Sequence, residues 1–189
     1  METTLYFVRH GESIFVEGQE RNRGLSDKGK LDALTVKEIL KAENIDHFIS
    51  SPCARAIETI APTAQSYEEE IKLEENLKER RVGDFSPHSF IEAKQMLFEN
   101  LSFAFPEGES SEEAQKRAVK VILEIFNKYE GKNIVIGTHG DIMTLMMNHF
   151  DPQYDYSFWR TTTMPDIYKV VFQGQKLVST TRLWEKKLH

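Results

Sequence analysis

The sequence has 189 residues, 40% hydrophobic and 29% charged, which is long enough for one domain with a substantial core and short for two. Its formal net charge is −6, and the absence of a long basic run argues against nucleic acid and anionic membrane surfaces as main partners. The lone cysteine, Cys53, excludes an internal disulfide and fits a reducing compartment. No targeting signal opens the chain, and no stretch approaches the roughly 18 apolar residues of a membrane span. We therefore expect one cytoplasmic domain over residues 1–189.

Strand and helix patterns alternate along most of the chain. Short apolar or β-branched runs predict strands at residues 3–8, 46–50, 71–73 and 133–137. Apolar residues at helical spacing predict helices at residues 26–42, 52–67, 90–101, 110–130 and 142–150. Two alternating runs, 167–173 and 176–182, predict a hairpin at a sheet edge, although the second run could also be a free tail. This order predicts a three-layer α/β/α sandwich with a mostly parallel sheet and an antiparallel C-terminal edge.

Three of the helices begin with recognisable N-terminal signals. Ser26 is a predicted N-cap, Ser110 and Glu113 form a predicted capping box, and Ser51-Pro52 suits the N-cap and the first helical position. The last signal places Arg55 in the first turn of its helix, where free backbone N–H groups and the helix dipole favour an anion. The alternative is that Arg55 pairs with Glu58 or with another surface carboxylate.

Side chains that suit a phosphoryl group follow three of the predicted strands. Arg9 and His10 end the first strand, Arg55 follows the second, and His139 follows the strand at 133–137. Because the carboxyl ends of parallel strands meet at one edge of a sheet, two guanidiniums and two imidazoles can converge there. Each of these residues, taken alone, could instead be an ordinary loop histidine or a surface arginine.

Five segments that lie in order along most of the chain carry a family resemblance. They are Arg9-His10-Gly11-Glu12-Ser13, Ser50-Ser51-Pro52 with Arg55-Ala56 and Glu58-Thr59, Leu77-Lys78-Glu79 with Gly83, Pro106-Glu107-Gly108-Glu109-Ser110, and Gly137-Thr138-His139-Gly140. Together they resemble the histidine phosphatase superfamily, the phosphoglycerate mutase-like proteins. The resemblance implies a phosphoglycerate mutase-like fold and an acid phosphatase-type phosphomonoesterase that uses neither metal nor cofactor and acts on small phosphorylated molecules.

The resemblance also implies a role for each core residue. His10 would attack phosphorus and carry a phosphohistidine, which requires one unprotonated ring nitrogen while a hydrogen bond holds the other. Arg9 and Arg55 would bind the equatorial oxygens, and His139 would be a third donor. Glu79 would be the general acid for the leaving alcohol and then the base for water, which favours a raised pKa and activity on the acidic side of neutral.

The loop after His10 departs from the family pattern. Val16 stands in the place of an asparagine, and Arg23-Gly24 stands in the place of a Gln-Gly pair near the transferred group. Arg23 is therefore a candidate substrate-binding residue, and it and Arg21 either grip a second anionic group or merely solvate the loop. Glu12 is expected to orient the arginines rather than to transfer protons.

Several alternatives stay open at this point. A cofactor-dependent phosphoglycerate mutase would use the same site but must exclude water, and the short segment between Phe85 and Glu109 favours water entry and hence a phosphatase. A binding protein on an inactive scaffold is a third possibility. A metal site would require Glu12 and Asp141 as ligands, because no cysteine or carboxylate cluster has metal spacing. His88 either lines the cleft or is an exposed loop histidine. The sequence determines neither the physiological substrate nor the oligomeric state.

Overall fold

The computed structural model describes residues 1–185, so the last four residues of the expected domain lie outside the described part. Its strands are β1 (Glu2–Arg9), β2 (His47–Ser50), β3 (Ile71–Leu73), β4 (Asn133–Thr138), β5 (Asp166–Gln173) and β6 (Lys176–Arg182). They form a 6-stranded sheet in the order β3-β2-β4-β1-β5-β6. The first four strands in this order run parallel, whereas β5 and β6 run antiparallel to their neighbours. The predicted antiparallel edge is confirmed, and residues 176–182 are a strand rather than a free tail.

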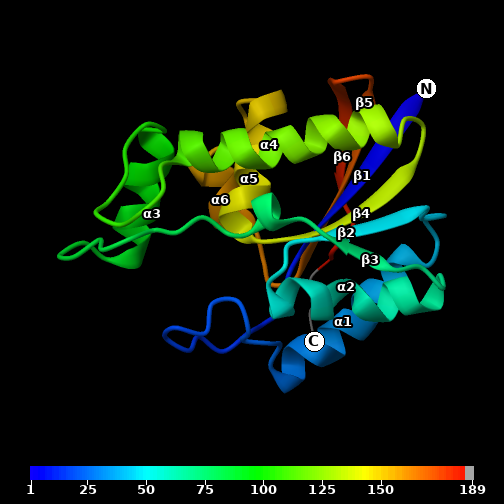
Figure 1. The fold of residues 1–189 in the computed structure, drawn as a ribbon, viewed down its shortest axis with the longest axis horizontal. Helices are drawn as coiled ribbons and strands as arrows, with labels where there is room; N and C mark the ends of the chain where they lie inside the picture. The colour runs from blue at the N-terminus through cyan, green and yellow to red at the C-terminus, as the bar shows by residue number, and fades with distance from the viewer. Residues whose placement is uncertain (186–189) are drawn as a thin grey trace.

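Helices cover both faces of the sheet, which confirms the predicted three-layer sandwich. They are α1 (Asp27–Leu40), α2 (Ala54–Ser66), α3 (Phe90–Glu99), α4 (Ser111–Lys128), α5 (Gly140–Phe150) and α6 (Tyr156–Thr161), with a 3-10 helix, η1, at Glu75–Leu77. Figure 1 shows α1 and α2 on one face and α4 and α5 on the other. No helix in residues 1–185 is long and apolar enough to cross a membrane.

The central strand β1 supplies side chains to both cores. Leu5 and Phe7 belong to the cluster that includes α4 and α5, whereas Tyr6 and Val8 belong to the cluster that includes α1 and α2. This division follows from the strand's period of two, which points successive side chains to opposite faces of the sheet. Burying each such side chain stabilises the fold by about 1.5–3 kcal/mol. The strand that ends at the candidate site is therefore held firmly from both sides.

The predicted start of α2 is wrong by two residues. The helix begins at Ala54 with Cys53 as its N-cap, so Ser51 and Pro52 lie before it. Ser51 instead continues the pairing of β2, because its N–H donates to the carbonyl of Gly137 at 2.9 Å. The N-caps predicted at Ser26 and Ser110 are confirmed.

Two other differences concern helices that adjoin the sheet. The helix predicted at 142–150 begins at Gly140, with His139 as its N-cap. The short helix α6 was not predicted, although Asp155 caps it by accepting the N–H groups of Ser157 and Phe158.

In Figure 1, α3 and the loop between β1 and α1 lie at the end of the molecule where the parallel strands finish. These segments therefore surround the candidate site.

Candidate active site

His10 follows β1 and is almost fully buried, at 6% exposure. Its Nδ1 lies 2.7 Å from the carbonyl oxygen of Gly11, and because a carbonyl can only accept, Nδ1 carries the proton and donates. The Gly11 N–H in turn donates to Thr59 Oγ1 at 2.9 Å, which fixes the turn. Burial, assisted by the charges of Arg55 and Arg9, lowers the pKa of His10 to about 3. His10 is therefore neutral at neutral pH, with the lone pair on Nε2.

Arg55 lies directly against this imidazole. It is 1% exposed, and its Nε donates to His10 Nε2 at 3.3 Å. Its Nη1 donates to the backbone oxygen of Glu20 at 2.5 Å, and its Nη2 pairs with the Glu20 carboxylate. Glu58, the partner considered from the sequence, instead accepts the N–H of Leu25 at 2.8 Å. Arg55 is thus a site residue whose counter-ion comes from the loop between β1 and α1.

His139 lies beside His10, with ring centroids 5.2 Å apart and the ring planes at 65°. Its Nε2 is 2.7 Å from Ser51 Oγ, whereas its buried Nδ1 has no hydrogen-bond partner within residues 1–185. Burial, followed by the nearby positive charges, lowers the pKa of His139 well below its ordinary value. A neutral ring with one unpaired nitrogen is therefore available to a bound group.

Arg9, the last residue of β1, is the second arginine of the site. Its Nη1 donates to Thr162 Oγ1 at 2.7 Å, and its buried Nε has no partner in the described part of the chain. The guanidinium packs on Gly140, where an added Cβ would lie 2.8 Å from Arg9 Cζ. Glycine is therefore required at position 140 for Arg9 to keep this position. Burial lowers the pKa of Arg9, although the nearby carboxylates oppose the shift.

Glu79 is held at the N-terminus of α5. Its Oε1 accepts from the N–H groups of Arg80 and Ile142, both at 2.9 Å, and its Oε2 accepts from the N–H of Asp141 at 3.0 Å. Burial and the charge of Asp141 raise the pKa of Glu79, and they outweigh the opposing effects of the Lys94 ammonium and the N–H donors. The five core residues predicted from the sequence, Arg9, His10, Arg55, Glu79 and His139, are therefore clustered at one edge of the sheet.

A match to a known family identifies the superfamily of this chain. The model of the histidine phosphatase superfamily, branch 1, matches residues 5–182. The chain belongs to the histidine phosphatase superfamily. Phosphoglycerate mutase-like protein 4 from Arabidopsis thaliana is a relative with 27% identity over 199 residues, and the match covers 96% of this chain and 84% of that protein. The resemblance predicted from the motifs is confirmed.

Solved structures share the fold of this histidine phosphatase superfamily member. A phosphoserine phosphatase from Entamoeba histolytica, solved as a mutant with phosphoserine, has a TM-score of 0.78 at 22% identity, covering 95% of this chain and 96% of that one. A mycobacterial glucosyl-3-phosphoglycerate phosphatase has a TM-score of 0.75 at 16% identity, covering 96% and 97% of the two chains. At these identities the likeness establishes the phosphoglycerate mutase-like fold.

Asp141 anchors the acidic side of the site. Its Oδ2 accepts from Arg80 Nε at 2.8 Å and from Lys94 Nζ at 2.5 Å. Burial alone would raise the pKa of Asp141, but the two cations hold it at about 2. Asp141 is therefore a charged structural partner, and within residues 1–185 no group of three or more His, Cys, Asp or Glu side chains is placed to hold a metal ion.

The two loop arginines have different surroundings. Arg23 is near the site, with its Nη1 donating to Ser13 Oγ at 2.8 Å and its Nε to the Glu20 carboxylate at 3.4 Å. Its charge contributes to the lowered pKa of His10. Arg21 instead pairs with Glu75 at 3.0 Å on the exposed surface. Arg23 is therefore the loop arginine whose charge acts on His10, whereas Arg21 is held by Glu75 at the surface.

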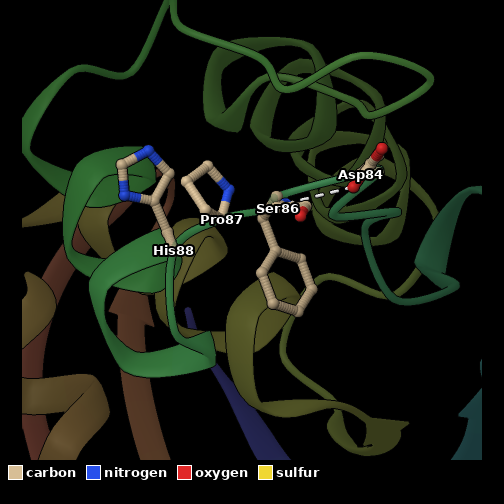
Figure 2. Close-up of a pocket in the computed structure, with 6 residues that line it drawn as sticks. Asp84, Ser86, Pro87 and His88 are labelled. Atoms are coloured by element: carbon tan, nitrogen blue, oxygen red, sulfur yellow. Dashed lines mark hydrogen bonds between the residues drawn. The ribbon is translucent and has the colours of Figure 1, made fainter.

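Glu12 and His88 lie outside the cluster. The expectation that Glu12 orients the arginines is wrong, because its exposed carboxylate accepts from Ser26 Oγ at 2.8 Å. His88 is exposed and lines a hollow of about 340 Å³ formed by residues 83–88 alone. Figure 2 shows His88 at one end of this loop and, at the other, Asp84 accepting the N–H of Ser86. His88 is therefore the exposed loop histidine of the two alternatives.

Several partners of the core residues are not evident from the sequence. Glu20 and Thr162 carry no local signal, because they meet Arg55 and Arg9 only through the fold. Ser51 was interpreted as a helix cap rather than as a partner of His139. Lys94 had a usable signal, since it shares a helix face with apolar residues and a buried lysine requires a counter-ion.

Proposed function

We propose that this protein is a phosphatase that hydrolyses small-molecule phosphomonoesters through a phosphohistidine on His10. The observation that carries the proposal is the ring of His10, whose Nδ1–H is engaged by Gly11 while Nε2 keeps its lone pair beside the Arg55 guanidinium. A neutral imidazole with a fixed tautomer is the nucleophile that phosphoryl transfer requires. Membership of the histidine phosphatase superfamily supports the same reaction.

In the first step, His10 Nε2 forms a bond to phosphorus while the bond from phosphorus to the alcohol oxygen breaks. The bonding electrons leave with that oxygen, and the protonated carboxyl of Glu79 supplies its proton. Arg9, whose Nε has no partner among residues 1–185, and Arg55 bind the equatorial oxygens. His139 adds an N–H from Nδ1 when the Ser51 hydroxyl donates to Nε2.

In the second step, water attacks the phosphohistidine and the bond between phosphorus and Nε2 breaks. The electron pair returns to Nε2, and the Glu79 carboxylate accepts the proton of the water. Inorganic phosphate leaves with both side chains restored. Two guanidiniums supply the positive charge that a metal ion supplies in other phosphatases, so the proposed reaction is independent of metal.

The test compares phosphate release by the wild-type protein and by His10→Ala on a panel of phosphomonoesters, without metal and with a chelator. The expected result is chelator-resistant release that falls by at least about a thousandfold in His10→Ala. His149→Ala is the matched control, since His149 is an exposed histidine on α5, and it is expected to keep wild-type activity.

A parallel assay of 3-phosphoglycerate isomerisation separates the two reactions of this site. Isomerisation without phosphate release would show that the protein is a mutase and not a phosphatase. Release that persists in His10→Ala, or that disappears with the chelator, would contradict the proposed mechanism. No turnover of either kind would leave a binding protein as the remaining function.

A further inference from the structure

A second cavity adjoins the cluster on the side of Arg9. It has a volume of about 280 Å³ and lies between the start of α3 and the segment from α6 to β5. This size suits the organic part of a small metabolite rather than a large ligand. Its apolar walls are Phe90, Ile91, Trp159 and Met164.

The charges of this cavity all have one sign. Arg9 and Arg160 are its charged lining residues, and no carboxylate is among the residues that line it. The Arg160 guanidinium is held over Tyr156, with its carbon 5.9 Å from the ring centroid and Nη1 donating to the hydroxyl at 3.4 Å. Since Arg9 belongs to the phosphoryl cluster, Arg160 is the cation left for a second anionic group.

Two aromatic rings of the wall lie close to a buried cation. The buried Lys94 ammonium lies 4.8 Å from the ring centroid of Phe90 and 5.8 Å from that of Trp159. Trp159 is 9% exposed, and its ring is 6.4 Å from that of Phe90. Trp159 is thus the buried part of the wall, whereas Phe90, Ile91 and Met164 are 50%, 44% and 47% exposed and offer apolar surface to a flat or apolar group.

Arg9 connects the cavity to the proposed chemistry. Arg9 lines the cavity, and its guanidinium packs on Gly140, the residue before Asp141. Because the Asp141 N–H donates to Glu79, the proposed acid for the leaving alcohol lies near the same guanidinium. We propose that this cavity binds the alcohol portion of the substrate, and that it selects an apolar or aromatic body bearing a carboxylate. This inference rests on the proposed phosphatase function. The rings replace water around the body, and Arg160 pairs with the carboxylate and repels a cation.

The test measures kcat/KM for phenyl phosphate, 4-carboxyphenyl phosphate and 4-(aminomethyl)phenyl phosphate. Arg160→Gln is expected to lower the value for the carboxylated ester about fivefold more than the value for phenyl phosphate, which is the size of a partly exposed ion pair. The same variant is expected to improve the cationic ester relative to phenyl phosphate. Comparing each ester between two proteins cancels the intrinsic reactivity of its leaving group. Lys30→Gln, which removes an exposed cation on α1, is the control and leaves the ratios unchanged.

The apolar wall has its own test. Ile91→Ser is expected to lower kcat/KM for all three aryl esters by about tenfold, the cost of removing an apolar contact from a substrate pocket. Ile91 is 44% exposed, so the variant is expected to fold. Leu31→Ser is the matched control, because Leu31 is 67% exposed and lies on α1.

A binding measurement keeps this inference separate from the proposed function. Benzylphosphonate and 4-carboxybenzylphosphonate cannot be hydrolysed at the phosphorus–carbon bond, and calorimetry gives their affinities without turnover. A preference for the carboxylated compound that Arg160→Gln removes would uphold the cavity even if every ester assay were silent. Equal affinities in the wild-type protein, or a preference that Arg160→Gln leaves intact, would overturn the inference even if the phosphatase activity were established.

Discussion

The pKa of Glu79 depends on groups that act in opposite directions. Burial and the charge of Asp141 raise its pKa, whereas the Lys94 ammonium and the backbone N–H donors lower it. The same N–H donors also fix the position of the Glu79 carboxyl. The start of α5 therefore determines both where this carboxyl lies and how far its pKa is lowered. Glu79 can hold a proton near neutral pH only if burial and the charge of Asp141 outweigh the groups that lower its pKa.

Glu79→Gln tests this balance. The variant is expected to lose about 10²- to 10³-fold in kcat/KM on alkyl phosphates and far less on para-nitrophenyl phosphate, whose leaving group needs little protonation. In the wild-type protein, kcat/KM on alkyl phosphates is expected to fall as pH rises through the raised pKa of Glu79, and the variant is expected to lose that limb. On the acidic side, the limb that belongs to His10 is expected near pH 3, where half of the His10 side chains hold a second proton.

The measurement is a pair of pH–rate profiles for each protein, one with each class of ester. Glu17→Gln is the control, because Glu17 is an exposed carboxylate outside the cluster. Equal losses on both esters, or a basic limb that persists in Glu79→Gln, would remove Glu79 from the role of general acid.

The loop between β1 and α1 places a carboxylate at two arginines of the candidate site. Glu20 pairs with Arg55 through its side chain and through its backbone oxygen, and it also accepts from Arg23 Nε. Two guanidiniums converging on one carboxylate are the arrangement that a phosphoryl group would need. In the proposed reaction, an incoming phosphate therefore displaces the Glu20 carboxylate.

Glu20→Gln is accordingly expected to tighten the binding of inorganic phosphate by about fivefold, because the amide keeps the size of the side chain but removes the competing charge. Calorimetric titration with phosphate measures this directly, and the gain should shrink as salt screens the charges. Glu17→Gln serves again as the control within the same loop. Unchanged or weaker phosphate binding in Glu20→Gln would show that Glu20 supports the site instead of competing for it.

Elements with a complete local signal were predictable from the sequence, and contacts between distant segments were not. The stripe and capping box of α4 and the buried run of β1 depend on neighbouring residues, so their patterns were sufficient. The start of α2 was mispredicted because Ser51 forms tertiary hydrogen bonds to β4 and to His139, which no local pattern records. Arg9, His10, Arg55 and His139 were predictable because they follow strand ends, and Glu79 was predictable only through the family resemblance. The Glu20 carboxylate and the cavity beside Arg9 arise only in the folded chain.

At the scale of the whole molecule, the buried histidines of the site lower the free energy of unfolding in acid. His10 and His139 are buried and neutral, with pKa values of about 3 and well below 6.5, whereas an unfolded histidine titrates near 6.5. Below that pH the unfolded chain binds more protons than the folded one, so the free energy of unfolding falls as pH falls. Glu79 acts in the opposite direction, because its raised pKa lets the folded state hold a proton first. The lowered pKa of Asp141, about 2, adds a further loss only below about pH 4.

His10→Asn removes one of these histidines and is expected to reduce the acid sensitivity of the fold. Between pH 6.5 and pH 5, each buried neutral histidine lowers the free energy of unfolding by about 2 kcal/mol, so the wild-type protein should lose about 2 kcal/mol more than the variant over this range. Urea unfolding followed by circular dichroism at several pH values gives both slopes. His149→Asn, at an exposed position, should keep the wild-type slope. If His10→Asn also kept that slope, His10 would be protonated in the folded state, and the lone pair that the proposed nucleophile requires would be absent in mild acid.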